Sequence, residues 1–257
     1  MDKPYNTLDR HFHLPHVRQV EASRPLLWLR MGWDDMRANL AASLTYGLIF
    51  SVIGYLILAY ATDLPYLFTA AISGFFLVGP LAAAGLYEIS RRHERGEPAS
   101  FADSLRGLRK HGDHLLYYGA FLAFVLLAWE RLSAILFALF YHGAAPDLGN
   151  FFQEVFLSGN YTHFVVSYMV VGGTIAGLVF ALSVISVPML MDRESDMVTA
   201  MMTSARAVGY NLGAMALWAA LIVLLVGIGF ATMMIGMVVL LPLLGHASWH
   251  AYKDLAE

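Results

Sequence analysis

The chain has no cysteine among its 257 residues, which removes several kinds of chemistry at once. Disulfides, thiolate metal sites, iron–sulfur clusters and covalent c-type haem attachment all need cysteine sulfur and are excluded. A net charge of −3 gives no basic surface of the kind that binds nucleic acid. The sequence also contains no recognisable catalytic motif, so we expect a protein that is not an enzyme.

Charged residues are scarce as well. They make up 14% of the chain, against about 25% in soluble domains, and the hydrophobic fraction is 58%, against about 45–50%. The mean hydropathy is +0.60. These values indicate a protein of the lipid bilayer, and we expect an all-α bundle of membrane-spanning helices. A length of 257 residues is simplest to interpret as one membrane domain.

The first 39 residues contain no long apolar run and no cleavable signal peptide, so the first apolar segment is expected to act as an uncleaved insertion signal. Residues 1–22 predict a flexible cytoplasmic arm. Ser23 followed by Pro25 is typical of a helix start. An apolar stripe then predicts an amphipathic helix, which lies either on the cytoplasmic membrane surface or against the protein's own cytoplasmic face. The stripe consists of Leu26, Leu29, Trp33, Met36 and Leu40.

Apolar runs predict six membrane-spanning helices, because a bilayer core takes about 20 apolar helical residues. From Asn211 to Tyr252 there is no Asp, Glu, Lys or Arg, and this stretch is too long for one crossing. It is expected to form two helices around a hairpin at residues 227–229. The predicted spans are residues 40–61, 66–89, 115–141, 162–191, 211–227 and 231–252, within one domain of residues 23–254.

The basic residues predict the orientation of these spans. Every Lys and Arg except Arg131 lies in a stretch that would face one side of the membrane, and residues 91–110 are the richest of these. The positive-inside rule therefore places both termini in the cytoplasm. Ser100 and Asp103 predict a capping box for a short cytoplasmic helix through Lys110. Ser195 is expected to cap a second one that reaches about Val208.

Glu130 and Arg131 are the charged residues inside a predicted span. Glu130 lies about 22 Å along a hydrocarbon core about 30 Å thick, at a depth where charges are costly and mark functional candidates. Adjacent helical residues point about 100° apart, so the two do not simply pair with each other. In the structural alternative, Arg131 reaches the outer interface and Glu130 pairs across helices.

Four histidines at the cytoplasmic ends of spans are candidate ligands. His246 and His250 are spaced i, i+4 and share a helix face, and His111 with His114 enters another span on the same side. Together they could bind a metal ion or ligate haem. Alternatively, they are interfacial residues that hydrogen-bond headgroups or backbone. The cofactor therefore stays unknown, with none as the first expectation.

Two further patterns concern helix contacts and symmetry. Gly173-x-x-x-Gly177 is a spacing that permits close contact between membrane helices. The segments Ser104-Leu105-Arg106 and Ser204-Ala205-Arg206 each follow a span that ends in a proline-containing run and precede another span. They suggest a weak internal repeat of parallel orientation.

Three segments carry a resemblance to a known family. They are Gly79–Pro98, Pro188–Arg193 and the terminal Pro242-Leu-Leu-Gly245-His246-Ala-Ser-Trp249-His250-Ala-Tyr252. With these the chain resembles a proteobacterial family of predicted integral membrane proteins of unknown function, some of whose members carry a label like cytochrome c oxidase subunit I. The resemblance implies a bacterial inner-membrane protein and no activity. A haem–copper oxidase core needs about twice as many spans, with ligating histidines buried inside them.

Three functional hypotheses follow. The first is a non-enzymatic accessory or assembly factor for membrane complexes, respiratory ones among them, whose partners are the lipid bilayer and other membrane proteins or further copies of itself. The second is a small transporter or channel that uses Glu130 and Arg131. The third is a metal- or haem-binding membrane protein that uses the four cytoplasmic-side histidines.

Overall fold

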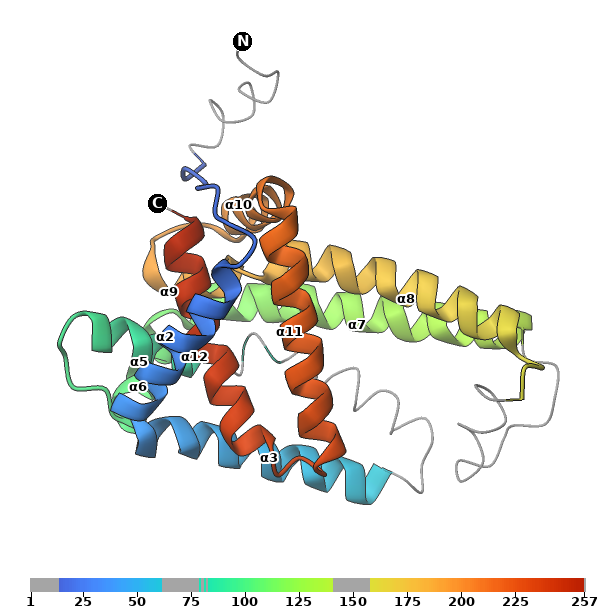
Figure 1. The fold of residues 1–257 in the computed structure, drawn as a ribbon, viewed down its shortest axis with the longest axis horizontal. Coiled ribbons are helices and arrows are strands. Elements are labelled where there is room, and N and C mark those ends of the chain that lie inside the picture. Colours follow the sequence, from blue (N-terminus) through green and yellow to red (C-terminus); the bar gives the residue numbers. More distant parts are fainter. Residues whose placement is uncertain (1–13, 62–78, 80, 82, 141–157, 257) are drawn as a thin grey trace, which may run out of the picture.

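The computed structural model describes residues 14–61, 79, 81, 83–140 and 158–256, and most of these residues are helical (Figure 1). The all-α class predicted from composition is confirmed over these ranges. The helices are α2 (Arg24–Ala38), α3 (Leu40–Ala61), α5 (Ala84–Glu94), α6 (Phe101–Lys110), α7 (Gly112–Phe140), α8 (Thr162–Ser183), α9 (Ser186–Asp192), α10 (Met197–Tyr210), α11 (Leu212–Ala231) and α12 (Met237–Leu255).

Four stretches of the described residues are long and apolar enough to cross a bilayer. They are Leu40–Ile57, Gly112–Phe140, Thr162–Asp192 and Leu212–Ala231, and they correspond to four of the predicted spans. Most of the predicted span at residues 66–89 lies outside the described residues. The span predicted at residues 231–252 corresponds to α12, which is not among the four. The total of six spans therefore stays a prediction.

The hairpin before α12 differs from the prediction. Helix α11 continues through Gly227 and Gly229 to Ala231, and the chain turns at Met233 and Met234, whose φ angles are 50° and 69°. Gly229 serves close packing instead, because a Cβ there would lie 2.3 Å from the sulfur of Met237. The expected turn at residues 227–229 is therefore wrong. Gly229 lies at a helix contact, whereas a Cβ on Gly227 would meet no atom within 4 Å.

The capping predictions are met in part. Ser100 and Asp103 form the predicted capping box at the start of α6. The cap of α10 is Asp196, which accepts the backbone N–H of Thr199, and not Ser195. Ser23 precedes α2 but its side chain makes no capping bond.

Helix α2 packs against α12, and its buried face includes only part of the predicted apolar stripe, with Met36 at 2% exposed. Its buried face includes Trp28, Gly32 and Asp35. A Cβ on Gly32 would lie 2.6 Å from the backbone nitrogen of Ala247, so the two helices approach as closely as backbones can. Leu26 and Trp33 of the predicted stripe are 56% and 39% exposed. The sequence allowed two placements for α2, on the membrane surface or against the protein itself. The second one holds for its buried face.

The C-terminal half of α12 is the centre of a group of helices that we call the head: α2, the first turn of α3, α5, α6, α9, α10 and the part of α12 from Gly245 onward. His246, Trp249 and Tyr252 have no exposed surface. The predicted N-terminal arm is attached here in its described part, since Arg18 N–H donates to the Leu255 carbonyl at 2.9 Å. Residues 1–13 of that arm lie outside the described residues.

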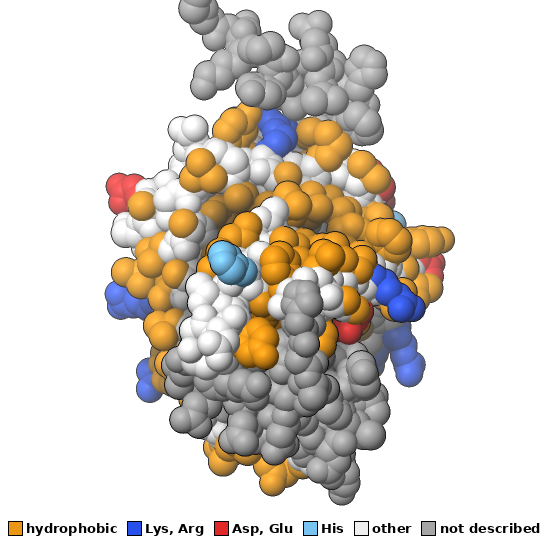
Figure 2. All heavy atoms as spheres, turned by 90° about the vertical axis from the view of Figure 1, so that its right-hand side faces the viewer, with side chains coloured by type: hydrophobic (Ala, Val, Ile, Leu, Met, Phe, Trp, Pro, Cys, Tyr) orange, Lys and Arg blue, Asp and Glu red, His pale blue; other side chains and the backbone are white. Residues whose placement is uncertain are grey.

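Helices α7 and α8 lie side by side and extend away from the head (Figure 1). Many of their side chains are exposed apolar ones, such as Leu116, Phe124, Met169 and Leu178, each at 60% or more. Figure 2 views the molecule from the end to which α7 and α8 extend, and its described surface is mainly hydrophobic with few charged side chains. An exposed apolar surface of this kind suits contact with lipid or with other membrane helices.

Candidate functional site

Five polar residues from four helices meet inside the head. Asp35 comes from α2, Ser43 from α3, Ser90 from α5, and His246 and His250 from α12. Each is less than 9% exposed, and Ser43, Ser90 and His246 are fully buried. Buried polar groups are costly unless they are hydrogen-bonded, so their partners determine whether this cluster stabilises the fold.

The five side chains form one continuous hydrogen-bonded chain. The Ser90 hydroxyl donates to Asp35 Oδ2 at 2.5 Å and lies 2.7 Å from His246 Nδ1. His246 Nε2 lies 2.9 Å from Ser43 Oγ. His250 Nε2 lies 2.9 Å from the same carboxylate oxygen of Asp35. Both nitrogens of His246 and the Nε2 of His250 are therefore engaged in this chain.

The carboxyl group of Asp35 stays ionised in this environment. Desolvation by burial alone would raise its pKa. The hydrogen bonds from His250 and Ser90, together with the charges of His250 and His246, outweigh that effect, and the pKa of Asp35 is lower than its ordinary value. The site thus holds a buried carboxylate, whose nearest surface group is His93, with Nε2 3.8 Å from Oδ1 and a side chain 46% exposed.

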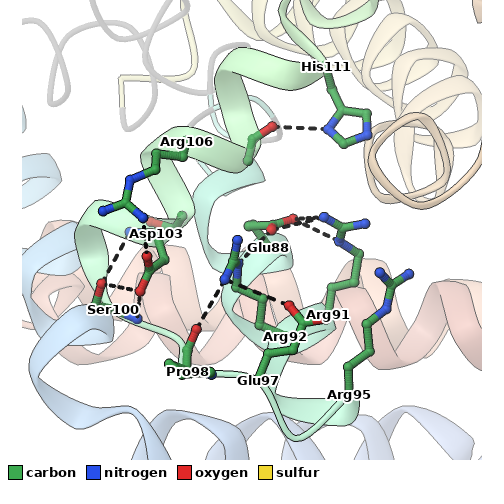
Figure 3. A network of polar contacts seen from close by, with 12 residues as sticks. Glu88, Arg91, Arg92, Arg95, Glu97, Pro98, Ser100, Asp103, Arg106 and His111 are labelled. Carbon is green, nitrogen blue, oxygen red and sulfur yellow. Dashed lines mark hydrogen bonds and ion pairs between the residues drawn. The ribbon is translucent and has the colours of Figure 1, made fainter.

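A second buried carboxylate lies on the other side of α5 (Figure 3). Glu88 has no exposed surface and accepts two hydrogen bonds from Arg91, at 2.8 and 2.9 Å, and one from Arg92 at 2.9 Å. A Cβ on Gly107 of α6 would lie 2.4 Å from the Glu88 carboxyl carbon, so α6 closes over this group. The three charge-assisted hydrogen bonds lie within α5 and satisfy the buried carboxylate.

The structure separates the four candidate histidines. His246 and His250 belong to the buried chain, whereas His111 Nδ1 lies 3.0 Å from the Gly107 carbonyl and His114 is exposed. Among the described residues, which include all four, no three His, Asp or Glu side chains are grouped so that they could hold a metal ion. The structure supplies no geometry for the metal or haem hypothesis.

Glu130 and Arg131 point in different directions from α7. Arg131 is exposed, and Glu130 is half-buried. The Glu130 Oε1 atom is buried and has no hydrogen-bond partner among the described residues, so the expected pairing of Glu130 across helices is not formed at that oxygen. Trp129, the preceding residue, packs its ring 5.0 Å from that of Tyr168 on α8.

The contact between α7 and α8 does not use the Gly173-x-x-x-Gly177 pattern. The glycine that faces α7 is Gly172, where a Cβ would lie 2.9 Å from the Trp129 ring. Gly173 and Gly177 are exposed, and a Cβ on either would meet no atom within 4 Å. The face that the spacing marked for close helix contact is therefore open along the described part of the chain.

Sequence reasoning did not identify Asp35, Ser43 or Ser90 as members of a site. Asp35 is not a member of the predicted apolar stripe, and the serines lie in or beside apolar runs where they carry no pattern. One signal was present: two histidines spaced i, i+4 in an otherwise uncharged segment need buried acceptors or donors nearby. Locating those partners required the arrangement of the helices.

Comparison with known proteins gives a match to a family model over part of the chain. Residues 67–192 match the family described as "Predicted integral membrane protein (DUF2189)". With the four apolar stretches, this match makes the protein an integral membrane protein of unknown function with several membrane-spanning helices. The DUF2189 segment contains Ser90, Glu88 and the α7–α8 pair, whereas Asp35, Ser43, His246 and His250 lie outside it. Neither curated proteins nor solved structures gave a match.

Proposed function

We propose that the protein is a non-enzymatic accessory factor of the bacterial inner membrane, which binds a helix of another membrane protein along α8. The observation that carries this proposal is the open face at Gly173 and Gly177. Within a bilayer, helices associate through close backbone packing at small residues, and the hydrophobic effect adds little. A pair of glycines four residues apart on an exposed helix face provides the shallow groove that such packing needs.

The surroundings of this face support an intermolecular contact. The neighbouring helix α7 packs against α8 at Gly172, through Trp129, and not at Gly173 or Gly177. Thr174 beside the groove turns its hydroxyl to the Val170 carbonyl at 2.7 Å, which keeps a polar atom off the helix surface. Val170 and Val166, about one and two turns before Gly173, are 62% and 54% exposed and would extend the contact. Respiratory complexes are the first class of partner to examine.

We further propose the topology in which this contact forms. The chain crosses the membrane six times, with both termini in the cytoplasm and the head at the cytoplasmic ends of the spans, and the head helices α6 and α10 are equivalent members of a parallel repeat. In support, both helices have a side-chain cap, at Ser100 and Asp196, and both fully bury the serine of the repeated motif, Ser104 and Ser204. The basic residues of α5 and α6 favour the cytoplasmic side for the head.

Enlarging both glycines should remove the partner. We expect the tagged wild-type protein, extracted from its native host with the surrounding lipid, to carry another membrane protein in fixed proportion. The double variant Gly173→Leu/Gly177→Leu should carry at least about tenfold less, which corresponds to a loss of about 1.4 kcal/mol of binding free energy. Quantitative mass spectrometry of the purified particles measures the ratio.

Ala220→Leu on α11 is the matched control, because it also enlarges an exposed small residue on a membrane-spanning helix. It should retain the partner. Equal recovery from the double variant would contradict the proposal, as would a wild-type protein that is recovered alone or only with further copies of itself.

A further inference from the structure

The hydrogen-bond directions around His246 define its protonation in the neutral state. Ser90 donates its single proton to Asp35, so it has none left for His246 Nδ1. Nδ1 must therefore carry the proton of that contact, and in a neutral imidazole the other nitrogen is then an acceptor. We assign the donor there to Ser43, whose hydroxyl lies 2.9 Å from Nε2 and equally far from the Asn39 carbonyl, to which it can donate instead.

Ser43 also has a second acceptor within reach. Its hydroxyl lies 2.9 Å from the Asn39 carbonyl, which already accepts the Ser43 backbone N–H at 3.0 Å. If Nε2 becomes protonated, the hydroxyl can turn to that carbonyl and accept a hydrogen bond from Nε2. None of the groups described here loses its hydrogen-bond partner in either state, so protonation does not add the cost of an unmade hydrogen bond to the cost of burying the charge.

Among the charged and titratable groups around His246, Asp35 favours the added charge, whereas burial and the charges of His250 and His93 oppose it. Asp35 from α2 is linked to it through Ser90, and its lowered pKa keeps the carboxylate ionised as a counter-ion. His93 from α5 and His250 from α12 are the other titratable groups that face it, and α3 contributes the neutral Ser43. His93 is the exposed member, so it connects this buried cluster to the surface of the head.

We propose that Ser43, His246, Ser90 and Asp35 form a binding site for one proton, which is taken up from the surface of the head on the side of His93. The proton adds to Nε2 of His246, the Ser43 hydrogen bond reverses, and the net charge of the cluster rises by one. No covalent bond within the protein breaks. This site is independent of the helix contact on α8 and adds a reversible ligand to the head, where α2, α3, α5 and α12 meet.

The test is solid-state NMR of the full chain in lipid bilayers with ¹⁵N-labelled histidine, because protonated and unprotonated ring nitrogens have different resonances. At about pH 8, above the ordinary histidine pKa of about 6.5, we expect His246 to carry its proton on Nδ1 only. Loss of these signals in His246→Gln assigns them. As the pH is lowered to about 4, both nitrogens should become protonated while the remaining spectrum keeps its folded dispersion.

Two serine variants make the result specific. In Ser90→Ala the Nδ1 proton loses its acceptor, so the proton should move to Nε2 and be donated to Ser43. In Ser43→Ala it should stay on Nδ1. A proton on Nε2 in the wild type at about pH 8, or unfolding on acidification before the second nitrogen is protonated, would overturn the proposal. If Ser90→Ala does not fold, the wild type and Ser43→Ala decide the question alone.

Discussion

Replacing Asp35 by alanine should lower the free energy of unfolding by about 3 kcal/mol or more. The substitution leaves the Ser90 hydroxyl and His250 Nε2 without their shared acceptor inside the head, and removing one partner of a buried charge-assisted contact costs about 3–5 kcal/mol. It should also release α2 from α12, since Asp35 lies in the middle of that contact. Reversible unfolding in mixed micelles, followed by circular dichroism, measures the change.

Asp34→Ala is the matched control, because Asp34 precedes it on the same helix but is exposed. It should leave stability nearly unchanged, and an Asp35→Ala variant that behaves like it would mean that the buried hydrogen-bonded chain does not stabilise the head.

The contribution of Asp35 to stability also depends on pH. Because the pKa of Asp35 is lowered on folding, its contribution is fully present above the unfolded value of about 3.9 and is lost as the pH falls through the lower folded value.

Gly47→Ala should be as damaging, for a steric reason. Gly47 lies in α3 where that helix crosses α12, and a Cβ there would lie 2.0 Å from the Val238 carbonyl oxygen. The obstacle is backbone and cannot rotate away, so the two helices must separate. Overpacking in a core costs about 1–3 kcal/mol and occasionally more, and we expect a value of about 3 kcal/mol here. Thermal unfolding in detergent gives the first measure.

Gly227→Ala provides the comparison for Gly47→Ala. Gly227 also lies in a membrane-spanning helix, but a Cβ there would meet nothing within 4 Å. Since alanine favours a helix over glycine by about 1 kcal/mol, this variant should be neutral or slightly more stable. Equal losses in both variants would show that the close approach of α3 and α12 does not limit stability.

The apolar spans were predictable because the bilayer imposes their length and composition. The predicted spans at residues 40–61 and 162–191 agree closely with Leu40–Ala61 and Thr162–Asp192, and the Ser100 capping box is local and was read correctly. The predicted position of the hairpin before α12 was wrong because Met233 and Met234 adopt left-handed φ angles, which a methionine in the sequence does not indicate.

The candidate site could be predicted only in fragments. The i, i+4 spacing of His246 and His250 correctly marked one helix face, but their partners come from residues far apart in the chain. Ser90 and Asp35 are 55 positions apart, and Asp35 and His250 are 215 apart. The face of α2 that meets α12 was missed for the same reason, since Gly32 and Asp35 add nothing to a hydrophobic pattern. Such contacts depend on how helices are arranged, which hydropathy does not encode.

The most direct test of the account is the side of the membrane on which the head lies. Because the chain has no cysteine, Arg109→Cys in α6 and Asn160→Cys before α8 each provide a single, exposed thiol. With a membrane-impermeant thiol reagent on intact cells of the native host, we expect Asn160→Cys to be labelled. Arg109→Cys should react only after the membrane is opened. Labelling of Arg109→Cys in intact cells would contradict a cytoplasmic head and the topology proposed from it.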